Sequence, residues 1–239
     1  MSGAVLLSTR GLSKRFDGLT AVEDVDFDLP AGEVRALIGP NGAGKTTLVG
    51  MFCGRINPSA GRIVFDGQDI TALPAHSRIR RGMAYTFQIT SVFPRLSVRE
   101  NVALAARLRI KGRAAVDRAV RDTLERVGLP GRPDEEAGNL SYGHQRLLEL
   151  AMGLVQAPRL LILDEPTQGL TEGEIASVKA LIEALRGDTT LLLIEHNMRV
   201  VMDVADRVTV LNFGRVLAEG TPAEIHADAA VQAAYLGTG

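Results

Sequence analysis

The sequence contains too little cysteine for an internal disulfide. Cys53 is the one cysteine among 239 residues, and a single thiol has no partner within its own chain. This usage fits a protein of a reducing compartment. We interpret Cys53 as a small buried hydrophobic residue.

The sequence also lacks an excess of charge and a long apolar run. Lys and Arg number 27 against 28 Asp and Glu, a net charge of −1, and the basic residues are scattered, which argues against a nucleic-acid-binding face. No stretch reaches the roughly 18 apolar residues of a membrane span, and Met1 to Arg10 does not have the pattern of a signal peptide. Any role at a membrane must therefore be carried by a partner.

The composition is that of a folded globular protein, with 46% hydrophobic and 23% charged residues. Apolar and acidic residues alternate from Val22 to Leu29, which predicts a half-buried antiparallel strand. The apolar run Val34 to Ile38 leads into glycines and a helix from about Thr46, the order typical of parallel sheets. Ile63 to Phe65, followed by Asp66-Gly67, indicates a hairpin.

The middle of the chain predicts a helical insert over about 89–157. Ser97 to about Val127 is rich in Ala, Arg and Leu at helical spacing, and Ser97 with Glu100 forms a capping box. A break rich in Gly and Pro, Gly128 to Pro133, ends this stretch, and a second helix begins at Ser141.

Strands and helices alternate again after Pro158. The predicted strands are Leu160 to Leu163, Thr190 to Ile194 and Val208 to Leu211, and capped helices begin at Thr171 and Thr221, the latter being the last helix. We therefore predict one α/β domain over 1–239, a mostly parallel sheet with flanking helices. Its core and an antiparallel β subdomain comprise 1–88 and 158–239, its helical subdomain comprises 89–157, and no C-terminal regulatory domain is expected.

A phosphate-binding loop is the most specific motif. Gly39 to Thr46 reads G-P-N-G-A-G-K-T, which matches G-x-x-x-x-G-K-[ST] between a predicted strand and helix. Glycines let backbone N–H groups face a phosphate, Lys45 can meet the β- and γ-phosphates, and the Thr46 hydroxyl can bind Mg²⁺. A chance match in a Gly-rich turn is the alternative, expected in about one of a few hundred sequences.

Two carboxylates follow the apolar strand Leu160 to Leu163. The edge where parallel strands end is where ligands bind, so Asp164 is placed to hold Mg²⁺ and Glu165 to polarise the water that attacks the γ-phosphate. An apolar strand ending in Asp-Glu is, by itself, as often a solvated strand end. The phosphate loop favours the functional interpretation.

Two further polar residues follow predicted strands. His196 can contact phosphate and water, and Gln88 can reach Mg²⁺ and report its presence to the insert. A lone histidine after a strand is more often structural than catalytic, and a glutamine at a strand end indicates nothing by itself.

The segment Leu140 to Gln145, L-S-Y-G-H-Q, opens a helix with small residues and free N–H groups that can face an anion. Because the chain already has one phosphate site, this second one is best explained if it completes the site of another copy. An ordinary Ser-capped helix is the alternative.

Together these residues resemble the nucleotide-binding subunit of ABC transporters over essentially the whole chain, which implies a P-loop NTPase core. In the family's terms Gly39 to Thr46 is Walker A, Gln88 the Q-loop, Leu140 to Gln145 the signature, Leu160 to Glu165 Walker B, Thr167 to Leu170 the D-loop and His196 the switch histidine. The resemblance implies ATP contacts at Phe16, Val22, Asn41, Gly42, Ala43, Gly44, Lys45, Thr46, Thr47, Ser141, Gly143 and Gln145. It implies Mg²⁺ contacts at Thr46, Gln88 and Asp164, and catalytic roles for Glu165, His196, Lys45 and Gln88.

Some residues depart from the common pattern of the family. The signature reads Ser-Tyr-Gly-His-Gln instead of Ser-Gly-Gly-Gln-Gln, Phe16 replaces a tyrosine, and Thr167 to Leu170 lacks the usual Ser-Ala or Ala-Gly run.

Short phrases resemble the branched-chain amino-acid importer ATPases, among them Tyr85 to Gln88, Ile194 to Met198 and Ala234 to Gly237. The implied partners are a second ABC ATPase subunit, transmembrane permease subunits and, indirectly, a solute-binding protein, and the implied location is the cytoplasmic face of the cell membrane. A permease is expected to dock near Gln88 to Ser97, which carries the apolar Phe93 and Leu96.

Three alternatives remain open. The ATPase of a lipopolysaccharide exporter is similar in several of the same phrases. A soluble ABC ATPase of DNA repair or translation usually carries long coiled-coil insertions or a second cassette, which this sequence lacks. A P-loop kinase or GTPase leaves the signature and His196 unexplained, and no N-K-x-D motif is present.

Overall fold

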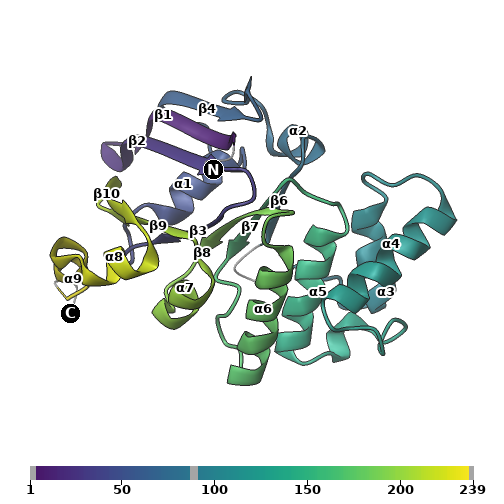
Figure 1. Ribbon diagram of the computed structural model, residues 1–239. Helices are drawn as coiled ribbons and strands as arrows, with labels where there is room; N and C mark the ends of the chain where they lie inside the picture. Colours follow the sequence, from purple (N-terminus) through teal and green to yellow (C-terminus); the bar gives the residue numbers. More distant parts are fainter. Residues whose placement is uncertain (1–3, 87–90, 237–239) are drawn as a thin grey trace.

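Two β-sheets and a set of helices form a layered molecule with a helical lobe at one end (Figure 1). The computed structural model describes residues 4–86 and 91–236. Within these ranges no helix is long and apolar enough to cross a membrane.

The larger sheet is the predicted parallel core. Its strands run in the order β10-β9-β3-β8-β7-β6, and all neighbours pair in parallel except β9 and β10. The bounds are β3 (Val34–Ile38), β6 (Met83–Thr86), β7 (Leu160–Asp164), β8 (Thr190–Ile194), β9 (Arg207–Asn212) and β10 (Arg215–Gly220). Every residue of β3, β7 and β8 is buried, as expected for strands covered on both faces.

The smaller sheet is antiparallel, in the order β2-β1-β4-β5. Its strands are β1 (Val5–Phe16), β2 (Leu19–Pro30), β4 (Ala60–Phe65) and β5 (Gln68–Asp69), so the predicted strand at Val22 and the hairpin at Asp66 are confirmed. The sequence analysis does not predict β1. Shifts in its pairing near Gly11, whose φ is +60°, interrupt the alternation that identifies a strand.

Helix α1 (Lys45–Phe52) lies between the two sheets (Figure 1). Its Phe52 stacks on Phe27 of β2 with ring centroids 5.5 Å apart. The short helix α2 (Ala75–Arg80) carries the buried Arg78, which donates to the carbonyl oxygens of Met51 and Phe52 at the end of α1. Unpaired carbonyls at a helix end are thereby satisfied.

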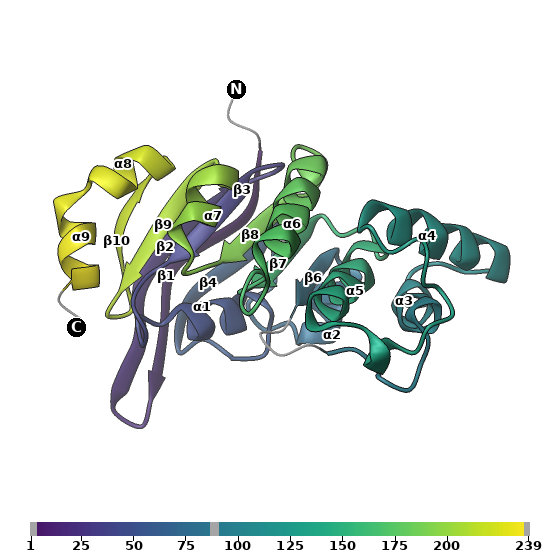
Figure 2. The ribbon, with the colours of Figure 1, turned by 90° about the horizontal axis from the view of Figure 1, so that it is seen from below.

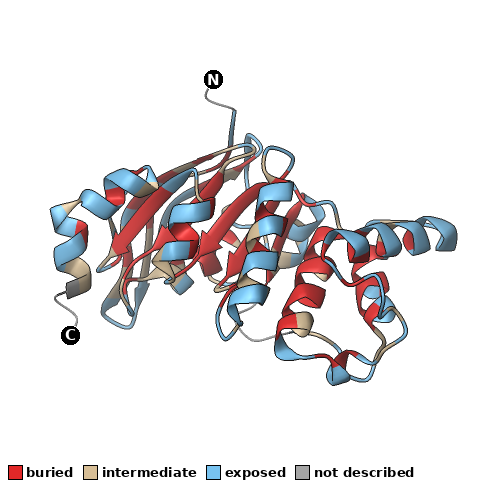
Figure 3. Cartoon of the chain, turned by 60° about the horizontal axis from the view of Figure 1, so that its bottom comes forward, coloured by how far each residue is buried: buried red, intermediate tan, exposed pale blue. Residues whose placement is uncertain are grey.

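Helices α6 (Glu172–Leu185) and α7 (Met198–Val204) cover the opposite face of the larger sheet, as the view from below shows (Figure 2). Figure 3 shows the buried strands between these helices and the antiparallel sheet, while the outer faces of α6 and α7 are exposed. The predicted capping boxes at Ser97, Thr171 and Thr221 are all present.

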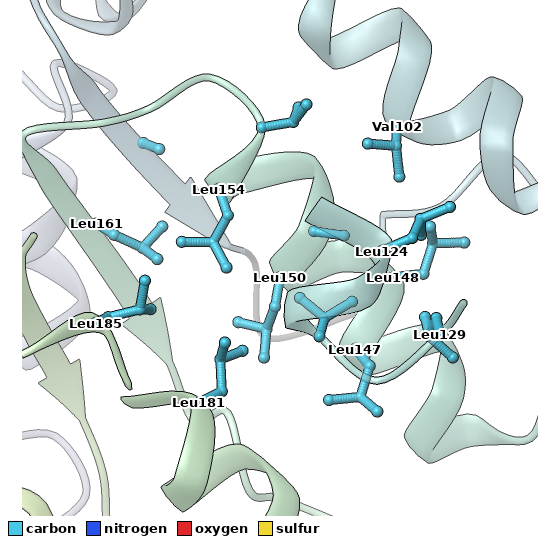
Figure 4. Close-up of a cluster of buried hydrophobic side chains, with 14 of the residues drawn as sticks. Val102, Leu124, Leu129, Leu147, Leu148, Leu150, Leu154, Leu161, Leu181 and Leu185 are labelled. Atoms are coloured by element: carbon cyan, nitrogen blue, oxygen red, sulfur yellow. The ribbon is translucent and has the colours of Figure 1, made fainter. Parts of the chain in front are cut away.

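The helical lobe contains α3 (Val98–Ala106), α4 (Arg113–Arg126), a 3₁₀ turn (Ala137–Asn139) and α5 (Tyr142–Leu154). The stretch predicted from Ser97 to Val127 is thus two helices, because Gly112 adopts a φ of +90° just before α4 begins. Leu150 and Leu154 of α5 pack toward Leu161 of β7 and Leu185 of α6 (Figure 4). The lobe therefore shares one hydrophobic core with the parallel sheet.

The chain beyond β10 forms two helices where one was predicted, α8 (Pro222–Ala227) and α9 (Ala229–Leu236). Asp228 separates them in an extended conformation, and its carboxylate accepts hydrogen bonds from the N–H groups of Ala230 and Val231. An Asp at this position caps a new helix.

Candidate nucleotide-binding site

A cavity of about 330 Å³ opens at the edge of the larger sheet where β3, β7 and β8 end. It is lined by Leu19, Thr20, Ala21, Asn41, Gly42, Ala43, Gly44, Lys45, Thr46, Thr47, Asp164, Glu165 and Ile194. The structure therefore brings the phosphate loop and the two carboxylates together, as predicted from the sequence.

Backbone atoms of two other segments, at Ala21 and Gly214, pack closely against the phosphate loop. Gly44, with a φ of +100°, has no room for a side chain, because a Cβ would overlap the carbonyl oxygen of Ala21. The N–H of Gly214, in the turn after β9, donates to the carbonyl oxygen of Ala43 at 2.9 Å. The loop leads directly into α1, whose first N–H groups suit an anion.

Lys45 is half-buried and its ammonium group lies inside this loop. Its Nζ donates to the carbonyl oxygens of Gly39 at 2.6 Å and Pro40 at 2.9 Å. Burial lowers the pKa of Lys45, while the charges of Glu165 and Asp164 act in the opposite direction. A phosphate anion in the cavity would favour the ammonium form further.

Asp164 is buried at the end of β7, with 6% of its surface exposed. Its Oδ2 accepts a hydrogen bond from the hydroxyl of Tyr85 on β6 at 2.5 Å. Burial raises the pKa of Asp164, and the hydrogen bond from Tyr85 opposes that shift. Tyr85 is a positioning partner that the sequence analysis does not identify.

The oxygen atoms of the cavity suit a hard divalent cation. Asp164, Glu165 and Thr46 line one space and supply the carboxylate and hydroxyl oxygens that Mg²⁺ prefers. The described part of the chain contains no cluster of three or more His, Cys, Asp or Glu residues that could hold a metal alone. A cation here would therefore share its coordination with phosphate and water oxygens.

Glu165 and His196 face each other across the ends of β7 and β8. Glu165 Oε1 lies 3.6 Å from His196 Nδ1, and the N–H of Glu165 donates to the carbonyl oxygen of Ile194 at 2.8 Å. Glu165 has a φ of +48°, which is uncommon for a residue with a side chain. A carboxylate and an imidazole that bind the same water molecule can deprotonate and orient it.

Arg146 of α5 connects the helical lobe to the backbone of Asp164 and Glu165, a role the sequence analysis does not predict. Its buried guanidinium donates to the backbone carbonyls of Asp164 at 2.6 Å and Glu165 at 3.0 Å, and to the carboxylate of Glu149 at 2.6 Å. The available signal was the pair Arg146 and Glu149, opposite charges three residues apart among apolar residues of one helix. The position of α5 is thereby coupled to the strand end that carries both acids.

The signature segment does not line this cavity. Ser141 caps α5 by accepting a hydrogen bond from the N–H of His144, and its hydroxyl lies 2.9 Å from His144 Nδ1. The side chain of Gln145 donates to the carbonyl oxygen of Leu140 at 3.2 Å. Gly143 leaves no space for a side chain, because a Cβ would overlap the carboxylate of Glu174.

The signature and the D-loop are in contact. Gly169 has a φ of +73°, and a Cβ there would lie 3.1 Å from the ring of Tyr142. The tyrosine that replaces a glycine in the signature thus lies against a glycine of the D-loop.

Phe16, Val22 and His196, predicted within this chain's own site, do not line the cavity. Phe16 is 43% exposed at the end of β1, and its ring lies 4.8 Å from Lys14 Nζ. Val22 is fully buried, so in this conformation it cannot touch a ligand, and the residues of β2 before it line the cavity in its place. Gln88 lies outside the described residues.

Comparisons with known proteins agree with the geometry. A family model described as "ABC transporter" matches residues 22–168, and one described as "Branched-chain amino acid ATP-binding cassette transporter" matches residues 215–239. The high-affinity branched-chain amino acid transport ATP-binding protein LivG of Escherichia coli (strain K12) is 42% identical over 250 residues, covering 97% of this chain and 98% of LivG. The lipopolysaccharide export system ATP-binding protein LptB of the same strain is 37% identical over 234 residues, covering 97% of each chain.

A solved structure has the same fold. The ADP conformation of MJ1267, an ATP-binding cassette of an ABC transporter, superimposes with a TM-score of 0.90 at 27% identity, covering 98% of this chain and 99% of MJ1267.

Removal of Arg146 should destabilise the protein strongly. We expect Arg146→Met to lower the free energy of unfolding by about 3–5 kcal/mol, because it takes away the cation beside the buried carboxylate of Glu149. Replacing both partners, with Arg146→Met and Glu149→Leu, should cost less than the sum of the two single changes. Urea unfolding followed by circular dichroism measures all three, and strictly additive losses would contradict the pairing.

Proposed function

The chain belongs to the ABC transporter ATP-binding family, and from this membership we propose that it powers a membrane importer of branched-chain or similar amino acids by hydrolysing ATP. One observation supports the enzymatic part above all others. The phosphate loop, the Asp164-Glu165 pair and His196 converge on one sheet edge, while the signature residues of the same chain lie outside that cavity. In this proposal the site is completed by a second subunit.

ATP would bind with its phosphates in the loop from Asn41 to Thr47. The backbone N–H groups and Lys45 would hold the β- and γ-phosphates, and Thr47 would contribute at the start of α1. The exposed ring of Phe16 is available to stack on the adenine, beside the apolar Leu19 that lines the cavity.

Mg²⁺ would be held by Thr46 and Asp164, with Gln88 as a further ligand predicted from the family pattern. When bound there, the cation would neutralise charge on the phosphates. The hydrogen bond from Tyr85 orients Asp164 toward that role.

Glu165 would act on the attacking water, and His196 would orient it and contact the γ-phosphate. Their side chains are close enough to share one water molecule, with 3.6 Å between Nδ1 and Oε1. Lys45 would stabilise the charge that develops on the phosphate oxygens as the bond to the leaving group breaks.

A second ABC ATPase subunit, identical or different, would supply Ser141, Gly143 and Gln145 to the γ-phosphate side of the nucleotide. Ser141 and the N-terminal N–H groups of α5 form an exposed helix start that suits an anion. ATP would then join the two subunits, and hydrolysis would release them.

A transmembrane permease would dock in the groove between the sheet edge and the helical lobe. This groove has a volume of about 330 Å³ and is lined largely by apolar side chains, including Ile79, Met83, Phe93, Leu108 and Met152. Phe93 and Leu108 are 51% and 68% exposed, which indicates a surface that a partner covers. Cys53 also lines it, and burial raises its pKa to about 12, so its thiol remains protonated.

Such a complex would place the chain at the cytoplasmic face of a membrane, with a solute-binding protein delivering substrate to the opposite side. The assignment to amino acids is supported by the likeness to LivG and by the second family model. The likeness to LptB makes a lipopolysaccharide exporter the second candidate, at lower identity.

Glu165→Gln should retain ATP binding and lose turnover. We expect hydrolysis to fall by about 100-fold or more, because the amide cannot accept a proton from water, and ATP-bound dimer should accumulate. Steady-state hydrolysis and size-exclusion chromatography measure the two effects. The control Glu172→Gln, at an exposed position on α6, should behave as the unchanged protein, and normal turnover by Glu165→Gln would refute the role of Glu165.

Ser141→Arg should block ATP-dependent dimerisation without weakening ATP binding by the monomer, because a long side chain would fill the contact between subunits. Gly131→Arg is the matched control, since a side chain at Gly131 points into open space within the same lobe. Both variants should be introduced into the Glu165→Gln protein and compared by light scattering with ATP. Equal dimerisation of the two would exclude Ser141 from the interface.

Isolation of the chain from its own cells should recover permease subunits with it. We expect the reconstituted complex to hydrolyse ATP several times faster when its solute-binding protein carries leucine, isoleucine or valine than when that protein is empty. Stimulation by lipopolysaccharide instead would assign the chain to an exporter. Recovery without any membrane protein would favour the soluble ATPase.

A further inference from the structure

Glu195 is a buried carboxylate that connects two loops of the candidate site. Only 1% of its surface is exposed. Its Oε1 accepts hydrogen bonds from Thr167 Oγ1 at 2.5 Å and from the N–H of Thr167 at 3.2 Å. Its Oε2 accepts from the N–H groups of His196 at 3.1 Å and Asn197 at 3.2 Å.

The two oxygens of this carboxylate serve different segments. Oε1 holds the first residue of the D-loop, which follows β7, and Oε2 holds the backbone that carries His196, which follows β8. Because a buried carboxylate is costly without its hydrogen-bond donors, neither segment can move away alone at low cost. The carboxylate thus fixes the position of one loop relative to the other.

The D-loop reaches the signature at its other end. Gly169 lies against the ring of Tyr142, the residue next to Ser141. Contacts therefore run from the signature helix through the D-loop to Thr167 and Glu195, and from there to the backbone of His196. The imidazole of His196 in turn lies beside Glu165.

We propose that Glu195 is a positioning residue that sets the location of His196 according to the position of the D-loop. When the signature meets the nucleotide of a second subunit, a displacement of the D-loop would pass through Thr167 and Glu195 to the histidine of the same chain. Hydrolysis in one site would thereby depend on engagement at the other. This inference rests on the proposed ATPase function and its two-subunit site.

The hydroxyl of Thr167 allows a test with a matched control. Thr209 also donates from a buried Oγ1 to a glutamate, Glu219 Oε1, at 2.7 Å, but it lies within β9, whereas Thr167 belongs to the D-loop. Thr167→Val and Thr209→Val each remove a buried hydroxyl that donates to a glutamate, and Thr209→Val also removes an acceptor of Arg35 Nη1. In Thr167→Val we expect kcat for ATP hydrolysis to fall about tenfold, while KM changes by less than about twofold. In Thr209→Val we expect both kcat and KM to stay unchanged.

Two further variants separate positioning from a general loss of packing. Thr167→Ser keeps the hydroxyl and should restore kcat. Glu195→Gln should lower kcat and leave KM similarly unchanged. The double variant Thr167→Val with Glu195→Gln should have about the same kcat as the slower of the two single variants, because both changes break the same contact. If Glu195→Gln does not fold, the comparison of kcat between Thr167→Val and Thr167→Ser still tests the role of this hydrogen bond.

The outcomes distinguish this inference from the proposed function. Equal kcat in Thr167→Val and the unchanged protein, failure of Thr167→Ser to restore kcat, or multiplicative losses in the double variant would overturn the role of Glu195 while leaving the ATPase intact. Absence of ATP hydrolysis in the unchanged protein with its partners would instead refute the proposed function.

Discussion

The parallel pairing of β3, β8 and β7 is the constraint on which the site depends. Strands that run side by side in one direction end at one edge, so the segments that follow them meet even though they are far apart in the chain. The phosphate loop follows β3, the two acids follow β7, and Glu195 and His196 follow β8. Complete burial of these strands fixes their register, and the register aligns Asp164 with Ile194.

Burial at this edge would be unfavourable for the charged groups without specific partners. Tyr85 donates to Asp164, Arg146 pairs with Glu149 and holds two backbone carbonyls, and Glu195 accepts four hydrogen bonds. These contacts join different elements, namely β6, β7, β8 and α5. The helical lobe is therefore joined to this edge of the sheet through polar contacts as well as through the shared leucine core.

Two glycines mark where the signature meets its neighbours. A Cβ at Gly169 of the D-loop would lie 3.1 Å from the ring of Tyr142 in the signature, so the two segments are in close contact. A Cβ at Gly143 would overlap the carboxylate of Glu174, which is held in its capping box with Thr171. The signature therefore packs against the D-loop and against the start of α6.

The sequence by itself determined the elements whose signals are local. The strand-loop-helix around Lys45, the acids after an apolar strand, the capping boxes at Ser97, Thr171 and Thr221, and the class of fold could all be predicted, because hydrophobic period, glycine spacing and helix caps depend on neighbours a few residues apart. Only the tertiary structure decided the contacts of Arg146, Glu195 and Tyr142, the burial of Val22 and the bulged strand β1. These contacts join residues that are distant in the chain. They depend on which strand ends become neighbours in the sheet, and a local sequence pattern does not contain that information.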